Sequence, residues 1–531
     1  MESNTTNTNT NTVQVRQVLW LLIVISASLM LGRIIAVDDL FNASVARLKF
    51  AQINSRLEQR KLDEQKQGRS EAQIKKILAE TKKKLQIEVA QYRRPFLSAN
   101  DRSRWCTIRA LVEPDMRVKD ADGKTVWFAI DIVQNQPGWD TIDMIKHTIP
   151  PSDDNELGYL YSSKPTLLPV LMTVPYYLIY NASGGRISFE NDTYFLVRTI
   201  LVLINLIPVV FCWFLMGRLI ERFGKNDWSK LFVMSFVCFG TFVSSFIITL
   251  NNHIPGICCV VISMYAASRI IFDGRRELRY YIISGFFAAF LYACELPGLS
   301  YTVFLMLVLL KLTPRETLLG YLPMVLIVFA ASDYTNYCAH QTHTPAYANK
   351  QWYNYKYERG KEKKESHWNN RKGTVDEGEK SRLTYVLHTT VGHHGIFSLT
   401  PVWFLSFAGL FCLLKQKNDK KLFYAALFIL SLSVICYVFY MFRPQPDRNY
   451  GGMTCGLRWM FWFIPLWIVA MLPVTDRLAC SRCGRILCTI LLIASIMSVA
   501  YPIWNPWDHP WFSHFMRYIG ISVLGWPAAV G

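Results

Sequence analysis

Long hydrophobic runs, separated by polar stretches, set the pattern of the chain. Most runs are about 20 residues long, which is the length that an α-helix needs to cross the hydrocarbon core of a bilayer. We expect the first transmembrane helix at 16–37. Ten further spans are expected at 195–220, 229–250, 254–273, 279–296, 299–313, 317–333, 397–414, 421–442, 455–474 and 486–504. The pattern predicts an all-α polytopic membrane protein with about 11 transmembrane helices.

Basic residues orient these spans. Lys and Arg gather in five short segments between spans, at 218–230, 275–279, 311–315, 415–421 and 477–485. Each segment is separated from the next by an even number of spans, so all five can lie in the cytoplasm, as the positive-inside rule favours. This parity leaves no crossing for the hydrophobic segment at 165–181, which contains three prolines. We therefore expect an interfacial helix there, on the outer face.

The resulting organisation alternates bundles with outer loops. A competing topology would place residues 38–164 in the cytoplasm, with the first segment and 165–181 both crossing. The expected divisions are a disordered tail at 1–15, an outer loop at 38–194 with interfacial helices at 100–181, transmembrane bundles at 195–333 and 397–504, a second outer loop at 334–396 and an outer tail at 505–531.

A charged arm at 44–94 opens the first outer loop. Its thin apolar stripe predicts two amphipathic helices broken near Gly68. Two interpretations stay open for this arm. It is either a solvated spacer, or a coiled-coil or lipid-headgroup arm.

Charge and cysteine content narrow the partners. The 531-residue chain carries a net charge of +18, and in a multispan protein much of that excess belongs to cytoplasmic ends. We therefore expect no nucleic-acid partner, and retain the bilayer and an anionic lipid-linked substrate. The 13 cysteines are scattered, many in apolar runs. The single CxxC at 480–483 lacks the second pair of ligands that tetrahedral zinc needs, so no metal ligands are assigned.

A polar, aromatic-rich stretch at 100–169 holds the candidate chemistry. Asp101 follows Asn100, a good N-cap residue, so its carboxylate is expected in the first turn of a helix over 101–113. Apolar residues of that helix give it a face that can lie on the membrane: Trp105, Ile108, Leu111 and Val112. Helix capping is the alternative role for Asp101. Lys146 and His147, later in the stretch, are expected at the surface.

Other ionisable or aromatic residues are expected near the same membrane face. Lys164 precedes a proline-started helix, and Arg458 stands at the outer end of a span, both at the level of lipid phosphates. Snorkelling of the lysine is the alternative. Glu295 lies at the outer end of another span, where a carboxylate needs a partner. The remaining candidates are Asp143, a second acidic residue, and Tyr161, His253, His393 and His394.

The order of several short motifs resembles a known family. They are Asn100-Asp101-Arg102-Ser103-Arg104, Ala110-Leu111-Val112-Glu113, Ala129-Ile130-Asp131, Tyr161-Ser162-Ser163-Lys164-Pro165, Asn252-His253, Glu295-Leu296-Pro297, Gly392 to Ser398, and Gly456-Leu457-Arg458. Spread over about residues 96–465, they resemble the GT-C superfamily of integral-membrane glycosyltransferases, which includes protein O-mannosyltransferases. The bacterial branch with RgtA/B/C/D-like domains is the most similar. Two positions depart from the family pattern. Arg102 replaces a second acidic residue after Asp101, and Thr166 follows the Lys164-Pro165 pair.

The resemblance implies an inverting transfer of a sugar from a polyprenyl-phosphate donor to an envelope lipid, glycan or protein. It implies catalytic roles for Asp101, Asp143 and Glu295, and donor-phosphate binding by Lys164 and Arg458. Substrate binding would fall to Tyr161, His253, His393 and His394. A divalent cation is possible, although none is certain. The site would face the outer, periplasmic side of a bacterial-type inner membrane.

Two other functions stay open. The first is a non-enzymatic transporter or a lipid- or glycan-handling membrane protein. We find no internal repeat, and charges within the spans are few, whereas transporters often show matched repeats with broken helices. The second is a ligase for a lipid-linked oligosaccharide, which would share the same geometry.

Overall fold

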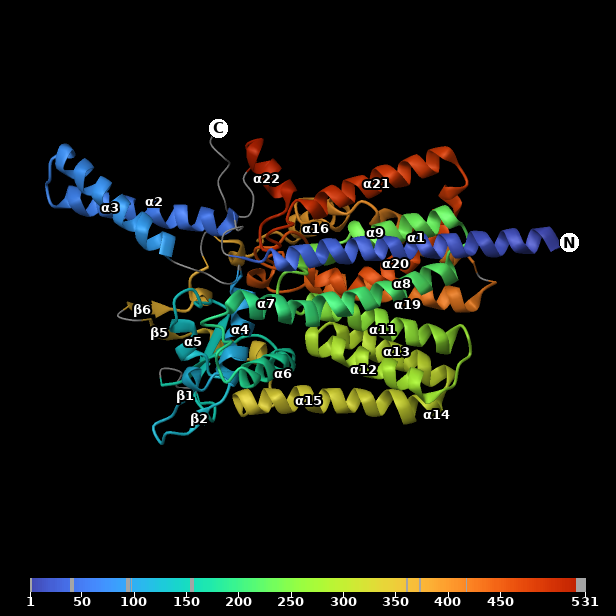
Figure 1. Ribbon diagram of the computed structural model, residues 1–531, viewed down its shortest axis with the longest axis horizontal. Helices are drawn as coiled ribbons and strands as arrows, with labels where there is room; N and C mark the ends of the chain where they lie inside the picture. The colour runs from blue at the N-terminus through green and yellow to red at the C-terminus, as the bar shows by residue number, and fades with distance from the viewer. Residues whose placement is uncertain are drawn as a thin grey trace.

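The structure is a computed structural model that describes residues 2–38, 43–91, 96, 98–152, 157–359, 362–371, 374–416 and 418–521. Long helices run side by side along the longest axis of the molecule, and loops and small hairpins gather at one end (Figure 1). The first loop helices, α2 (Ala43–Lys66) and α3 (Glu71–Gln91), stand away from this bundle as a pair (Figure 1). The described part of the chain therefore divides into a bundle, a loop layer and a projecting pair.

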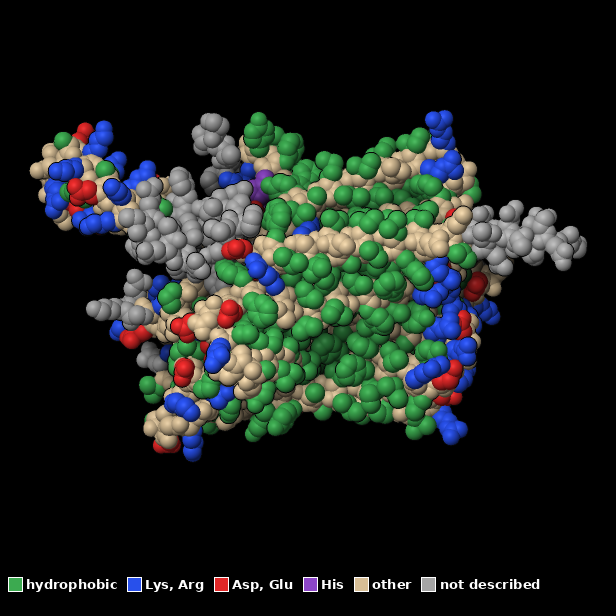
Figure 2. Space-filling view, in the orientation of Figure 1, with side chains coloured by type: hydrophobic (Ala, Val, Ile, Leu, Met, Phe, Trp, Pro, Cys, Tyr) green, Lys and Arg blue, Asp and Glu red, His purple; other side chains and the backbone are tan. Residues whose placement is uncertain are grey.

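Eight helical segments of the described chain are long and apolar enough to cross a membrane: Val13–Ile35, Thr193–Phe223, Asp227–Phe246, His253–Ile271, Pro314–His340, Lys420–Met441, Arg458–Ala479 and Arg482–Ala500. Exposed apolar side chains cover the face of the bundle that Figure 2 shows, between its two ends. Apolar side chains on the outside of a bundle are stable against lipid tails but not against water. The protein is therefore a helical membrane protein.

These segments combine several elements. They are α1 (Glu2–Ile35), α7 (Thr193–Leu201), the π-helix η2 (Val202–Leu206), α8 (Ile207–Phe223), α9 (Asp227–Phe239), α10 (Val243–Phe246), α11 (His253–Ile271), α14 (Pro314–Glu316), the π-helix η3 (Thr317–Tyr321), α15 (Leu322–His340), α19 (Lys420–Met441), the 3-10 helix η9 (Arg458–Phe463), α20 (Ile464–Ala479) and α21 (Arg482–Ala500). The helix α1 continues through residues 2–15, where a disordered tail was expected. No Pro or Gly interrupts that stretch.

Three expected spans correspond to shorter helices, namely α12 (Leu278–Cys294), α13 (Gly298–Leu312) and α18 (Trp403–Lys415). Together with the eight longer segments they occupy the 11 expected positions, but the count of 11 crossings stays a prediction. The segment expected at the interface forms α6 (Leu167–Ala182). Its position relative to a bilayer also stays a prediction.

The five basic segments meet at one end of the bundle. Arg222 pairs with Asp273, and Lys421 donates to the Phe272 carbonyl. Asp476 accepts from the backbone of 225 and 226. Lys and Arg side chains cover this end, opposite the loop layer (Figure 2). The parity of the basic segments along the sequence thus corresponds to a shared location in space.

The loop layer lies at the other end and contains β-structure. Its helices are α4 (Ala99–Val112), α5 (Asp131–Asn135), α16 (Arg382–Thr390), α17 (Ile396–Leu399) and α22 (Trp511–Tyr518). Its strands form three antiparallel hairpins, β1 (Val118–Lys119) with β2 (Thr125–Val126), β3 (Met144–His147) with β4 (Tyr159–Ser162), and β5 (Lys356–Arg359) with β6 (Glu362–Glu365). The all-α expectation is therefore wrong in this layer. Short strands with charged or mixed sequences give a weak alternating pattern.

The helix α4 is enclosed by protein, which corrects the expectation of a membrane-facing surface. Trp105 stacks on Phe96 with ring centroids 5.2 Å apart, and Phe189 packs against both rings. Arg109 binds Glu113 at 2.8 Å, and Tyr176 of α6 donates to the same carboxylate at 2.5 Å. Buried charges need such partners. These contacts hold α4 between α6 and the loop layer.

Lys146 and His147 are buried, so the expectation of a surface position was wrong. The His147 ring stacks on Tyr161 at 4.3 Å and on Trp352 at 4.0 Å. Lys146 donates to the Lys356 carbonyl at 3.1 Å. Residues that are far apart in sequence thus form a second small core within the loop layer.

Candidate functional site

The polar corner between α10 and α11 is the centre of the candidate site. Asn251 fixes this corner, because its Oδ1 accepts from the backbone N–H groups of His253 and Ile254 at 2.8 and 3.0 Å. Its Nδ2 donates to the Phe246 carbonyl at 3.1 Å. An amide side chain that satisfies first-turn N–H groups is a strong helix start. The corner therefore holds residues 250–253 in a defined conformation.

Asp101 reaches this corner from the first turn of α4. Its Oδ1 accepts from the Leu250 N–H at 3.0 Å, and only 3% of the residue is exposed. Burial raises the pKa of this carboxyl to about 7, although the Leu250 N–H and Arg104 oppose the shift. The helix is capped by Ser98, whose hydroxyl accepts from the Asn100 N–H. The expected capping role of Asn100 was therefore wrong.

Arg104 lies one turn further along α4. It donates to Asn100 Oδ1 at 2.5 Å and to Asn252 Oδ1 at 2.7 Å. Burial lowers the pKa of this guanidinium to about 10, while Asp101 and Asp143 act in the opposite direction. We assigned Arg104 no role from the sequence. Its spacing of three residues from Asp101, on one helix face, was the available signal.

Glu295, His253 and Arg458 form a continuous chain of hydrogen bonds. His253 Nδ1 lies 2.5 Å from Glu295 Oε1, and His253 Nε2 lies 2.9 Å from the Arg458 guanidinium. Arg458 Nε also donates to the Gly451 carbonyl at 2.9 Å. Gly451 has a φ of +93°, in the region that favours glycine. The glycine thus allows a loop carbonyl to hold the guanidinium.

Lys164 and Asp143 form an ion pair at 2.9 Å beside this chain. Burial lowers the pKa of Lys164, and Arg104 and Arg458 contribute to the shift, whereas Asp143 opposes it. Ser103 of α4 donates to the Asp143 carbonyl at 2.6 Å and contacts the Ser162 hydroxyl. The hairpin β3–β4 thereby brings the ion pair against α4, where both charges interact with Arg104.

Six sequence-predicted residues are thus gathered around Arg104. They are Asp101, Asp143, Lys164, His253, Glu295 and Arg458. The region holds three cationic and three acidic side chains. Such a density of charge in a buried region is expensive unless it is paired or functional. The catalytic and binding roles expected for these residues stay predictions.

The other three candidates lie in separate clusters. Tyr161 packs between His147 and His340, in the second small core. His393 and His394 contact one another at 2.6 Å between their Nδ1 atoms, and both rings pack against Tyr450. Burial lowers the pKa of His393 to about 2. The expected substrate-binding roles of these three residues stay predictions.

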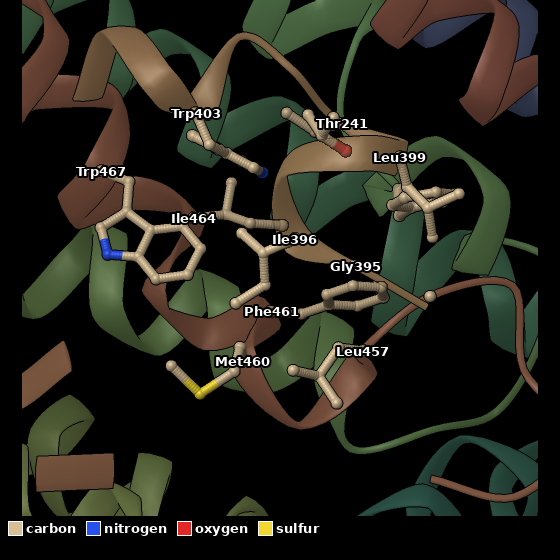
Figure 3. A pocket seen from close by; sticks show the side chains of 13 residues that line it. Thr241, Gly395, Ile396, Leu399, Trp403, Leu457, Met460, Phe461, Ile464 and Trp467 are labelled. Carbon is tan, nitrogen blue, oxygen red and sulfur yellow. The ribbon is translucent and has the colours of Figure 1, made fainter. Parts of the chain in front are cut away.

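A small apolar cavity lies in the bundle next to the charged region (Figure 3). It is lined by Thr241, Phe242, Gly395, Ile396, Leu399, Thr400, Trp403, Gly456, Leu457, Met460, Phe461, Ile464 and Trp467. The side chains of Ile396, Phe461 and Ile464 lie close together in it (Figure 3). Two lining residues, Gly456 and Leu457, directly precede Arg458. The cavity therefore adjoins the charged region, because its lining residue Phe461 also packs edge-on against the His253 ring.

Among the described residues, no group of three or more His, Cys, Asp or Glu side chains could hold a metal ion. No family model matches the chain, and no curated protein matches it.

Two solved structures of the oligosaccharyltransferase from Archaeoglobus fulgidus are similar to the chain at 11% identity. The alignment with the complex that contains zinc and sulfate covers 68% of this chain and 47% of the oligosaccharyltransferase chain, with a TM-score of 0.40. The alignment with the apo form covers 77% of this chain and 52% of the oligosaccharyltransferase chain, with a TM-score of 0.43. The chain thus spans about half the length of these proteins. At these values the likeness assigns neither a family nor an activity.

Proposed function

We propose that the chain is a membrane glycosyltransferase that moves a sugar from a polyprenyl-phosphate donor to an envelope lipid, glycan or protein acceptor. The observation that carries the proposal is the buried carboxylate of Asp101 in a region that also holds three cationic side chains. Arg104, Lys164 and Arg458 supply the positive charge. The reaction would take place on the outer face of a bacterial-type cytoplasmic membrane.

The cations would stabilise the departing lipid phosphate. Charge develops on that phosphate as the bond between its oxygen and the sugar breaks, and cations held in a dry site stabilise such charge strongly. Arginine fits this task because its N–H groups match phosphate oxygens. Apolar residues that follow Arg458 in sequence, such as Met460 and Phe461, would contact the first part of the prenyl chain. Phosphate and chain would then lie in adjoining regions.

Asp101 would act as the general base. The acceptor hydroxyl oxygen attacks the anomeric carbon, its proton passes to the Asp101 carboxylate, and the bonding pair leaves with the polyprenyl phosphate. The configuration inverts because attack and departure occur on opposite faces of the sugar. Asp143 contacts Lys164, and Glu295 contacts His253. We therefore propose that these two carboxylates hold the phosphate-binding side chains in place while Asp101 takes the proton.

The test is transfer from a short-chain prenyl-phosphate sugar by purified protein. Asp101→Asn keeps an acceptor for the Leu250 N–H but cannot take a proton. We expect a rate loss of about 10²–10⁴ with a melting temperature near that of the wild type. Asp101→Glu should retain part of the activity. Asp115→Asn, at an exposed carboxylate of the same segment, is the matched control and should behave like the wild type.

Full activity of Asp101→Asn would exclude its role as the base and move the search to Asp143. A stability loss of about 0.5–1 kcal/mol without a rate loss would support the capping alternative. The absence of transfer by the wild type, with any prenyl-phosphate sugar and acceptor extract, would contradict the proposed function itself.

A further inference from the structure

Asn252 and His253, two consecutive residues of the corner, accept hydrogen bonds from two different arginines. Asn252 Oδ1 accepts from Arg104 at 2.7 Å, and His253 Nε2 lies 2.9 Å from an Arg458 nitrogen. His253 is only 1% exposed, and Asn252 is half-buried. The two arginines come from parts of the chain more than 300 residues apart, so the corner is the element that they share.

The end of α12 holds the opposite side of both residues. Asn252 Nδ2 donates to the Cys294 carbonyl at 3.0 Å, and His253 Nδ1 lies 2.5 Å from Glu295 Oε1. Residues 294 and 295 therefore support residues 252 and 253 in the same order. One chain of hydrogen bonds runs from Cys294 through Asn252 to Arg104, and the other runs from Glu295 through His253 to Arg458.

The chemistry of the partners fixes the orientation of both side chains. Arginine only donates hydrogen bonds, so Asn252 must present its Oδ1 to Arg104 and His253 must present an unprotonated Nε2 to Arg458. The proton of the neutral imidazole is then on Nδ1, where it donates to Glu295. A carbonyl only accepts, so Cys294 fixes the Asn252 amide in the same sense. No alternative amide orientation or tautomer satisfies both neighbours.

We propose that Asn252 and His253 are positioning residues that aim Arg104 and Arg458 at the donor phosphate. The inference rests on the proposed function. Glu295 then acts through His253 and Arg458 without taking part in proton transfer. Arg458 uses two of its N–H groups on His253 and Gly451, while a guanidinium has five in total. The others would serve the donor phosphate.

The test measures binding of farnesyl phosphate to the purified full-length protein in detergent. Losing a charge-assisted hydrogen bond weakens binding by roughly 10–100-fold, and we expect this loss for Arg458→Ala. His253→Ala should weaken binding by at least several-fold. The double variant His253→Ala/Arg458→Ala should bind no more weakly than Arg458→Ala alone, because both changes act through the same guanidinium. Asn252→Ala and Arg104→Ala should show the same non-additivity.

Conservative variants separate positioning from folding. His253→Gln keeps an acceptor for Arg458 and should bind within a few-fold of the wild type. Glu295→Gln keeps an acceptor for the His253 Nδ1–H and should do the same, whereas Glu295→Ala should resemble His253→Ala. His343→Ala, at an exposed histidine paired with Asp333, is the matched control. These conservative variants keep the test decisive if an alanine variant does not fold.

Multiplicative losses in the double variants would overturn the inference, because the residues would then act independently. Weak binding by Glu295→Gln, equal to that of Glu295→Ala, would also overturn it, since a charge and not a hydrogen bond would then be required. A wild-type protein that does not bind farnesyl phosphate would instead contradict the proposed function, and the positioning role would fall with it. Normal binding of farnesyl phosphate by the wild type, with multiplicative losses in the double variants, would overturn the positioning role but leave the proposed function standing.

Discussion

At the scale of single residues, the burial of Asp101 determines how activity should depend on pH. A general base is reactive only when it is ionised, and burial raises the pKa of this carboxyl to about 7. At pH 6 about one-tenth of such a group is ionised. We therefore expect the rate of transfer to rise about tenfold per pH unit below pH 7, and to level off above it. Steady-state rates between pH 5 and 9 provide the measurement.

The same profile for Asp101→Glu is the control for this prediction. Its acidic limb should shift with the pKa of the new carboxyl, while the variant Asp115→Asn should leave the limb in place. An acidic limb that stays unchanged in Asp101→Glu would assign the titration to another group. Donor binding, measured over the same pH range, shows whether the limb belongs to the chemical step.

Several residues of the site could be predicted from the sequence, and others could not. Glu295 stands out because a carboxylate at the end of a span is costly without a partner. Asp101, Lys164 and Arg458 stand out by their positions at a helix start, before a proline-started helix and at the outer end of a span. Arg104 lies in a quoted motif, but its contact with Asn252 joins positions 148 residues apart. Sequence spacing carries no information about such a contact. The position of Tyr161 in a separate core was inaccessible for the same reason.

At the scale of elements, the helices were predictable and their surroundings were not. Apolar periodicity correctly located α4, but an apolar face is equally suited to lipid and to protein. Phe96 and Phe189, on either side of α4 in sequence, complete the core around Trp105. The three β-hairpins were missed because two- to four-residue strands have little alternation to detect. The helices α2 and α3 were correctly predicted, with a break near Gly68.

The hairpin of α2 and α3 should be dispensable for the fold of the bundle. Its small core, Ile53 and Leu85 with Leu57 packed against them, is separate from the main core. Glu64 pairs with Arg60 and Arg69 inside the hairpin itself. We expect that replacing residues 43–91 with a flexible linker changes the melting temperature by less than about 2 °C. Thermal unfolding in detergent is the measurement.

Trp105→Ala is the comparison for this deletion. It removes a large side chain from the main core and should cost about 3–5 kcal/mol. The hairpin would belong to the main fold if its deletion lowered the melting temperature as strongly. Ile53→Asp should melt near the wild-type temperature, since it disturbs only the contact between α2 and α3.

At the scale of the whole molecule, the basic segments and the candidate site occupy opposite ends of the bundle. The ion pair of Arg222 with Asp273 and the contact of Lys421 with Phe272 lie at one end. Asp101 contacts the corner at Leu250 at the other. Since positive charge favours the cytoplasmic side, this separation supports an outward-facing site. The even number of spans between successive basic segments predicted this shared location, because each pair of antiparallel helices returns the chain to the same end of the bundle.

Thiol labelling of intact cells tests this orientation. Cys480 is exposed at the end that carries the basic segments, and Asp122→Cys would introduce a thiol in the exposed β1–β2 turn of the loop layer. A membrane-impermeant maleimide should label residue 122 in intact cells and residue 480 only after permeabilisation. Cys338→Ser and Cys483→Ser in the background remove the other exposed thiols, so that Cys480→Ser then identifies the contribution of each remaining site. The reverse pattern would place residues 98–164 in the cytoplasm. That result would contradict both the orientation and the proposed function, because the proposed reaction uses its lipid-linked donor on the outer face of the membrane.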